Sequence, residues 1–441
     1  MWINDLRNEP NPLERWPDGT LDDETVDSIR RVLDVESAAG YNAIDLAGLL
    51  ATRAWPVDIT SVDNQRRRRV SQIIQAAHER DMKVICFPSG VLSWGFEKII
   101  KQDPAVRAKD GRGRVMNPLR DESWRWQEKV FDYFIDNYDI DGIHLESADQ
   151  GRCKTEECLQ KWPNDAAYHC YVTGRAADYL RRKNRRLTLL ATIQSFIYPV
   201  REFSEEEKNL LVELSNHVDC LFDQGHQGTY IPQSARRNFL RKLYCGYGTS
   251  GGFWIYPPQS WDRLRWFLPY TNKTGVHIKQ LAEDGGVGVM YYQGPVRNPS
   301  TEVNIAFGGR IMKNPGGQPE AVLYEVLDQP YRPRNGAALR ALASIYRRAE
   351  DGYFAVRKPP LPGELTLGGS DSTYLSDPYL DTEGRYAYKQ TLLSLLTDLA
   401  RISDHFSDGG RVLRIKSCLE ATLSDIHKIA AAYGEKKIIS P

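Results

Sequence analysis

Four acidic residues each stand at the end of a short apolar run of the kind that forms a buried strand. They are Asp5, Asp45, Glu146 and Asp223. The clearest run is the segment Asp141–Ser147, in which Glu146 closes the alternating apolar stretch before a glycine-containing loop. Carboxyl groups can give and take protons, and two of them facing one substrate can act as acid and base. Such chemistry requires a fold that brings the ends of separate strands to one place.

Strand-like runs recur eight times before about residue 295, separated by stretches with helical periodicity. The strand-like runs cover 2–6, 42–46, 83–88, 143–146, 187–192, 218–223, 244–247 (or 253–256) and 287–292. Helices are predicted over 22–39, 122–139, 166–183 and 205–215, with another after the run Arg66–Arg69. Alternating apolar strands and helices indicate a parallel sheet covered by helices, and about eight such units predict a TIM (β/α)8 barrel. A doubly wound open sheet is the rival fold, but no glycine-rich phosphate fingerprint follows any strand.

The pattern changes beyond residue 295. Residues 294–317 are rich in Pro, Gly and Asn, so we expect a long loop at the barrel face. Helical periodicity returns over 337–349, 388–406 and 411–433. The sequence therefore predicts two parts, a barrel domain over residues 1–320 and an α-helical bundle over residues 321–441.

The strand ends of a TIM barrel meet at one face, where active sites lie. Asp5, Asp45, Glu146 and Asp223 are therefore expected at one rim. Hydrolysis of a glycosidic bond needs one carboxyl group to protonate the leaving oxygen and another to act as base or nucleophile. We assign these roles to Glu146 and Asp223. Asp5 and Asp45 would bind hydroxyl groups or raise the pKa of Glu146 by repulsion, although support of loop amides explains them equally well.

Other side chains near the predicted strand ends suit carbohydrate binding, since aromatic faces pack on sugar rings and polar edges bond to hydroxyls. The residues expected in the pocket are His144, Arg152, Gln194, His226, Tyr247, Trp254, Tyr291 and Tyr292, with Trp94 at its edge. His144 lies two residues before Glu146, so it could orient that carboxyl group or bond to a sugar. A structural role in the core fits His144 as well.

The segment Asp141–Glu146 resembles the fourth strand of several TIM-barrel glycoside hydrolases, in which Asp-Gly precedes a strand ending in a catalytic acid. The run Asp103–Gly111, followed by Asn117-Pro118, resembles the loop those enzymes place after the third strand. Residues 1 to about 300, with the helical tail, are similar to α-glucuronidase-like and β-hexosaminidase-like barrels. No Asp-Glu pair closes the fourth strand, so substrate-assisted attack by an N-acetyl group is not supported.

An α-glucuronidase likeness implies a basic residue facing the carboxylate of the sugar. Arginine suits this role because a guanidinium group grips a carboxylate with two hydrogen bonds. The candidates are Arg7, Arg53, Arg152 and Arg297, and the sequence does not choose among them.

The composition points away from polyanion and membrane partners. The 441 residues contain 58 basic and 58 acidic side chains, so no global attraction to nucleic acid or membrane is indicated. The run Arg66–Arg69 fits a solvated helix face better than a nucleic-acid patch. No stretch of about 18 apolar residues predicts a transmembrane helix, and the first residues lack the features of a signal peptide. We expect a cytoplasmic protein, or a secreted or periplasmic one if a signal peptide was removed.

Cysteine usage predicts neither disulfides nor a metal centre. The chain has 7 cysteines, an odd and scattered set. Cys153, Cys158 and Cys170 lie near His169, but their spacing is looser than that of usual zinc pairs, so free thiols are favoured. We expect no cofactor and a carbohydrate partner, and the sequence is compatible with a homo-oligomer.

The predicted function is glycoside hydrolysis by two carboxyl groups. A lyase or isomerase acting on a uronate or sugar acid on the same barrel remains an alternative, as does a barrel that binds carbohydrate without catalysis. The distance between the carboxyl groups, which decides between inversion and retention, is not given by the sequence.

Overall fold

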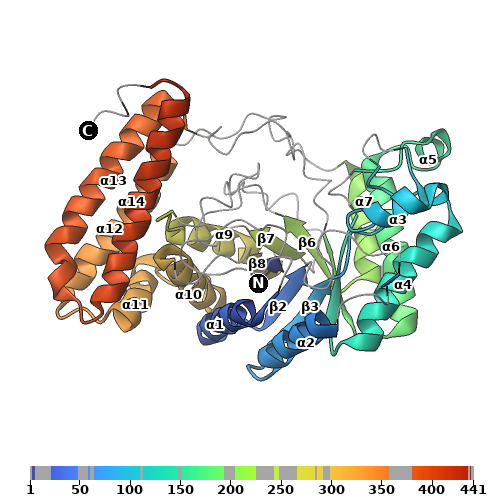
Figure 1. Cartoon of the computed structure of the whole chain (residues 1–441), viewed down its shortest axis with the longest axis horizontal. Coiled ribbons are helices and arrows are strands. Elements are labelled where there is room, and N and C mark those ends of the chain that lie inside the picture. Colours follow the sequence, from blue (N-terminus) through green and yellow to red (C-terminus); the bar gives the residue numbers. More distant parts are fainter. Residues whose placement is uncertain are drawn as a thin grey trace.

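The structure is a computed structural model that describes residues 2–4, 21–47, 58–59, 64–109, 113–147, 151–192, 204–224, 243–247, 266–283, 286–291, 298–356, 380–435 and 438. At its centre lies a sheet of eight parallel strands, hydrogen-bonded in sequence order (Figure 1). The strands are β1 (Trp2–Asn4), β2 (Ala43–Ala47), β3 (Lys83–Phe87), β4 (Gly142–Glu146), β5 (Thr188–Thr192), β6 (Cys220–Gln224), β7 (Leu243–Tyr247) and β8 (Gly286–Tyr291). The predicted parallel sheet is confirmed, and of the two alternatives for the seventh strand the first is correct.

Helices connect the strands and cover the sheet, with α1 and α2 beside β2 and β3 and with α4, α6 and α7 on another side (Figure 1). Those before the tail are α1 (Asp23–Ala39), α2 (Asn64–His78), α3 (Glu97–Gln102), α4 (Asp121–Asn137), α5 (Glu156–Lys161), α6 (Asp165–Lys183), α7 (Glu205–His217), α9 (Thr271–Glu283) and α10 (Pro299–Lys313). Capping fixes several of their starts: Asp22 accepts from Thr25 N at 2.9 Å, and Ser204 and Glu207 form a reciprocal capping box. Within the described residues, no helix is both long and apolar enough to span a bilayer.

The expectation of a long loop over residues 294–317 is wrong, because α10 occupies Pro299–Lys313. The residues that suggest a loop are the start signals of this helix. Asn298 accepts a hydrogen bond from Ser300 N, and Pro299 stands at the first helical position, where its missing N–H is not needed. Gly309 allows close packing on α1, since a Cβ atom there would lie 2.2 Å from the carbonyl oxygen of Ala39.

Side chains of the strands alternate between the two faces of the sheet. In β4, Ile143 and Leu145 are fully buried in the apolar core that the helices share. In β2, Ile44 and Leu46 lie in the same core. The intervening residues therefore face the side of the sheet away from the helices, which is the inside of a barrel-like arrangement.

The tail consists of α11 (Pro319–Tyr331), α12 (Gly336–Val356), α13 (Thr382–Ile402) and α14 (Gly409–Ala432). Helices α12, α13 and α14 lie side by side at one flank of the molecule (Figure 1). Two buried polar contacts join α14 to the segment that precedes α9. Trp266 Nε1 donates to Asp425 Oδ2 at 2.8 Å, and Phe267 N donates to Thr422 Oγ1 at 3.0 Å. The tail is thus bonded to the part of the chain that carries the sheet.

A carboxylate of the tail also caps a helix of the sheet region. Glu350, on α12 and 1% exposed, accepts hydrogen bonds from the backbone N–H groups of Thr271, Asn272 and Lys273 at 2.8, 3.0 and 2.8 Å. The Thr271 hydroxyl donates to it at 3.1 Å. These groups form the first turn of α9, whose N–H groups have no partner within the helix. Burial raises the pKa of Glu350 to about 7, and the hydrogen bonds oppose this rise.

Candidate active site at the carboxyl end of the fourth strand

Glu146 is the last residue of β4 and is 5% exposed. Its position is fixed from both sides of the strand. It pairs with Thr192 in the register of β4 and β5, and its carbonyl oxygen accepts from Val91 N at 2.6 Å in the segment after β3. The alternation in β4 directs its side chain to the sheet face away from the helices. A carboxyl group at the carboxyl end of a parallel strand, on the inner face, occupies the usual place of chemistry in this architecture.

A buried polar network lies directly before Glu146. His144 Nδ1 and Asp45 Oδ2 are 2.6 Å apart, and His144 Nε2 forms a hydrogen bond with the hydroxyl of Thr192. All three residues are at most 4% exposed. A carboxylate can only accept, so the Nδ1 atom carries the proton of its bond with Asp45. Because Thr192 is also the register partner of Glu146, the network supports the backbone that carries this carboxyl group.

This network changes the roles predicted for Asp45 and His144. Both ring nitrogens of His144 already have protein partners, so the ring has no nitrogen left for a sugar hydroxyl. Asp45 directs one carboxylate oxygen to His144 rather than to the mouth of the site. Sequence alone could not pair these residues, since 99 positions separate them.

Aromatic rings continue from His144 toward the surface. The ring of Phe87 lies 5.4 Å from that of His144, and Trp94 stacks on Phe87 with ring centroids 5.5 Å apart and planes 23° apart. Trp94 is partly exposed, whereas Phe87 is buried. The structure thus places Trp94 near the carboxyl end of β3, and its position at the edge of a substrate pocket stays a prediction. A partly exposed indole there offers a flat apolar face to a sugar ring.

A second polar cluster anchors the residue after Glu146. Ser147 is 2% exposed, and its hydroxyl lies 2.9 Å from His169 Nδ1 and 3.1 Å from Thr173 Oγ1 on α6. In the sequence, His169 stands out only by its position near the cysteines, so its contact with Ser147 is not predicted. The one available signal is that His169 and Thr173 are four residues apart in a helix, and therefore on one face. Burial lowers the pKa of His169 to about 4, so the ring is neutral near pH 7.

His169 should make the folded state sensitive to acid. Between pH 6.5 and about 4 the unfolded chain binds a proton at this ring and the folded chain does not, so stability falls as the pH is lowered. The loss attributable to His169 should approach about 3 kcal/mol at pH 4, from ~1.4 kcal/mol per pKa unit. His169→Asn should remove this part of the slope in urea unfolding measured from pH 4 to 7. Equal slopes for the variant and the native chain would contradict the assignment.

The guanidinium group of Arg152 is engaged in contacts around its own loop. Its guanidinium donates to the carbonyl oxygens of Cys158 and Trp162, pairs with Asp165 at 3.3 Å, and lies over the ring of Tyr168. The group is 5% exposed and braces the loop before α6. The structure therefore gives Arg152 a structural task rather than the predicted contact with a sugar carboxylate.

The neighbouring thiols are also engaged in local contacts. Cys153 Sγ lies 3.4 Å from Thr155 Oγ1, and Cys158 Sγ lies 3.5 Å from Asn117 Oδ1. Burial raises the pKa of Cys158 to about 12, with a hydrogen bond to Cys153 adding to the rise. The Cys158 thiol therefore keeps its proton near pH 7. Among the described residues, no three His, Cys, Asp or Glu side chains are grouped as metal ligands.

Three further predicted residues are placed by their strands. Asp223 lies in β6, and Tyr247 and Tyr291 are register partners at the ends of β7 and β8. Since all strands are parallel, these positions share the end of the sheet at which Glu146 stands. Thr192 pairs with Phe222, so Asp223 is one residue beyond the row that contains Glu146. The remaining predicted residues lie outside the described residues, namely Asp5, Arg7, Arg53, Gln194, His226, Trp254, Tyr292 and Arg297.

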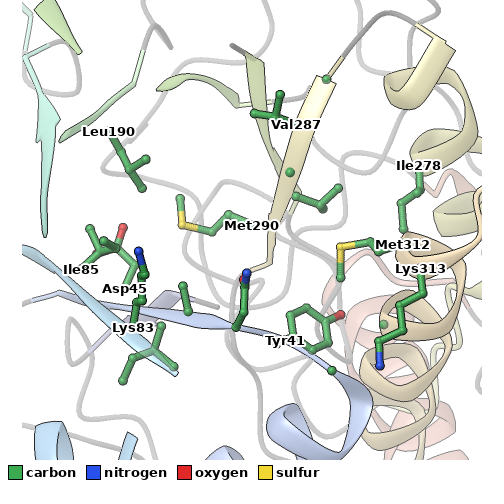
Figure 2. Close-up of a pocket in the computed structure, with 18 of the residues that line it drawn as sticks. Tyr41, Asp45, Lys83, Ile85, Leu190, Ile278, Val287, Met290, Met312 and Lys313 are labelled. Carbon is green, nitrogen blue, oxygen red and sulfur yellow. The ribbon is translucent and has the colours of Figure 1, made fainter. Parts of the chain in front are cut away.

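A cavity of about 480 Å³ lies at the opposite, amino end of the strands (Figure 2). Lys83 at the start of β3 and Lys313 at the end of α10 line it, together with apolar side chains such as Leu190 and Met290. Asp45 also lines this cavity. The predicted substrate pocket at the carboxyl end and this cavity are therefore different places, joined through the contact of Asp45 with His144.

The similarity of this chain to known proteins lies in its fold. No protein-family model and no curated protein matches the chain. Its structure is similar to that of a GH138 enzyme targeting pectin rhamnogalacturonan II, with a TM-score of 0.59 and 11% identity over 98% of this chain. The chain spans 57% of the length of that protein. It is also similar to a mutant of the Thermobaculum terrenum O-GlcNAc hydrolase, with a TM-score of 0.52 and 11% identity over 94% of this chain and 84% of the other. The chain therefore shares a TIM-barrel-like fold with these two proteins, as the resemblance in its sequence implies.

Proposed function

We propose that the protein is a glycoside hydrolase in which Glu146 is the general acid. The observation that carries this proposal is the position of Glu146 at the carboxyl end of β4, on the inner face of a sheet whose fold is shared with glycoside hydrolases. The proposal includes closure of the sheet between β1 and β8, which would gather all eight strand ends around one mouth. It also includes a catalytic domain over residues 1–320 and a helical bundle over residues 321–441.

The reaction would proceed by proton transfer between paired carboxyl groups. Glu146 would protonate the oxygen of the leaving group as the glycosidic bond breaks, and a second carboxylate would act as base or nucleophile. We assign the second role to Asp223, which lies at the same end of the sheet as Glu146. Because Phe222, and not Asp223, stands in the row of Glu146, this role requires the chain to depart from regular strand alternation at Asp223. The low exposure of Glu146 and its place at the end of β4 support the acid role.

The network of Asp45, His144 and Thr192 would keep Glu146 in place rather than touch the substrate. Its bonds are short and buried, so the backbone around residues 144–146 is held rigidly. Trp94, Tyr247 and Tyr291 would form the walls that pack on the sugar. Sites held by such supporting contacts keep the catalytic group within the small tolerance that proton transfer requires.

A panel of aryl glycosides that includes uronides tests the proposal directly. Release of the aryl group from at least one member, with the sugar recovered intact, is the expected result. An unsaturated product absorbing in the near ultraviolet would instead indicate a lyase. Sugar binding in calorimetry without product from any glycoside would indicate a binding protein, and either outcome would overturn the assignment.

A further inference from the structure

The run Arg66–Arg69 plays no part in the proposed hydrolysis, and α2 divides it into two pairs. Arg66 is buried, and Arg69 donates to Asp23 Oδ1 at 2.9 Å and to the carbonyl oxygen of Leu21 at 2.8 Å. Arg69 therefore fastens α2 to the start of α1. The sequence-based expectation of one solvated face holds for only part of the run.

Arg67 and Arg68 are placed differently. Among the described residues, no hydrogen bond or ion pair joins either guanidinium to a partner. Both line a pocket of about 420 Å³ between α2 and the end of α4. Asn64, Ser71 and Gln72 stand on the same side of α2, at the spacing of one helix face.

The end of α4 forms the other wall with Asn137 and Tyr138. Tyr138 is 7% exposed and packs on the rings of Tyr133 and Phe134, with centroids 6.2 and 5.9 Å away. Its hydroxyl has no hydrogen-bond partner among the described residues. Burial raises the pKa of Tyr138, with Tyr133 adding to the rise and the charge of Arg67 opposing it, so the hydroxyl keeps its proton.

We propose that this pocket binds the phosphate or sulfate group of a small molecule. Every polar side chain that lines it can donate a hydrogen bond, and no carboxylate is among them. Guanidinium groups match the oxygens of a phosphate or sulfate with paired, charge-assisted bonds. The volume falls within the usual range for small-molecule sites, of roughly 300–1,000 Å³, and leaves room for an organic part beside the anion.

The size of the pocket and its charge argue against a nucleic-acid surface. Only two of the four arginines are available, and the chain as a whole has a net charge of zero. A polymer of phosphates is held by many basic residues spread along a face. Two guanidinium groups at one pocket suit a single anionic group.

Titration calorimetry on the full chain tests the proposal with inorganic phosphate, inorganic sulfate, phenyl phosphate and acetate as probes. We expect saturable binding of phenyl phosphate, weaker binding of the two inorganic ions and no binding of acetate. Arg67→Gln and Arg68→Gln should each weaken the affinity for phenyl phosphate by about tenfold, as the loss of a charge-assisted pair implies. Tyr138→Phe should weaken it by a smaller factor while leaving the melting temperature unchanged.

Arg30→Gln is the matched control, since Arg30 is an exposed arginine on α1 that pairs with Asp27 in its own helix. This variant should bind phenyl phosphate like the native chain. All variants should hydrolyse aryl glycosides at the native rate, because the pocket lies on the helix layer and Glu146 on the inner face of the sheet. Absence of saturable binding by the native chain, or equal affinities of the Arg67→Gln, Arg68→Gln and Arg30→Gln variants, would overturn the proposal.

Discussion

Replacing Glu146 by Gln should lower kcat roughly 1,000-fold on a glycoside with an alkyl leaving group, since general acid catalysis supplies about 10²–10⁴-fold. The amide has the size of the carboxyl group but cannot deliver a proton. A nitrophenyl glycoside, whose leaving group departs without protonation, should lose much less. The comparison of the two leaving groups by steady-state kinetics separates an acid from a nucleophile, because loss of a nucleophile slows both substrates.

Glu79→Gln is the control for this experiment, because Glu79 is exposed just after α2. It should leave both rates unchanged. Asp223→Asn should abolish turnover of both substrates if Asp223 is the second carboxylate. Asp45→Asn should chiefly lower the melting temperature, because Asp45 is bonded to His144. Near-native rates of Glu146→Gln on the alkyl glycoside, with its fold intact by circular dichroism, would remove the acid from the mechanism.

Replacing Glu350 by Ala should destabilise the fold by roughly 3 kcal/mol, because it leaves the buried N–H group and hydroxyl of Thr271 and two partly buried N–H groups without acceptors. These groups belong to the first turn of α9, so the helix start loses its cap. Glu350→Gln should lower the free energy of unfolding by less. One side-chain oxygen still accepts from Thr271 and Asn272, and only the N–H group of Lys273 loses its acceptor, because the new amide group faces it. Urea unfolding followed by circular dichroism measures both differences.

Glu325→Ala provides the comparison, since Glu325 is an exposed residue paired with Arg310. Surface pairs of this kind contribute about 0–1 kcal/mol, so its effect should be small. A loss of stability in Glu350→Ala no larger than that of Glu325→Ala would show that Glu350 does not hold α9. The helices after residue 320 would then stabilise the sheet region less than their hydrogen bonds to it indicate.

The local patterns of the chain predicted the fold well where strands are buried on both faces. The apolar run that ends at Glu146 and the run 187–192 are short, bounded by loops, and separated by helical periodicity, so each could be recognised alone. The resemblance of the segment Asp141–Glu146 to glycoside hydrolases led to the same fold as the comparison of structures. Patterns within ten or twenty residues are sufficient to predict strands and helices of this kind.

Long-range polar contacts could not be predicted in this way. Asp45 and His144 are far apart in sequence, and either residue alone reads as a candidate for binding substrate. The cap that Glu350 provides for α9 could not be predicted either, because no residue near Glu350 in the sequence indicates which helix its carboxylate contacts. Helix α10 was missed for the opposite reason, because Asn298 and Pro299 signal a helix start and a loop alike.

The bonds from Trp266 and Phe267 to α14 bear on how this chain could be divided. A fragment that stops near residue 320 would expose an indole nitrogen and an amide that are buried among partners in the whole chain. Genetic recombination that exchanges residues 321–441 for an unrelated module would meet the same difficulty. We therefore expect the helices after residue 320 and the sheet region to fold and to be exchanged in evolution together, as one domain.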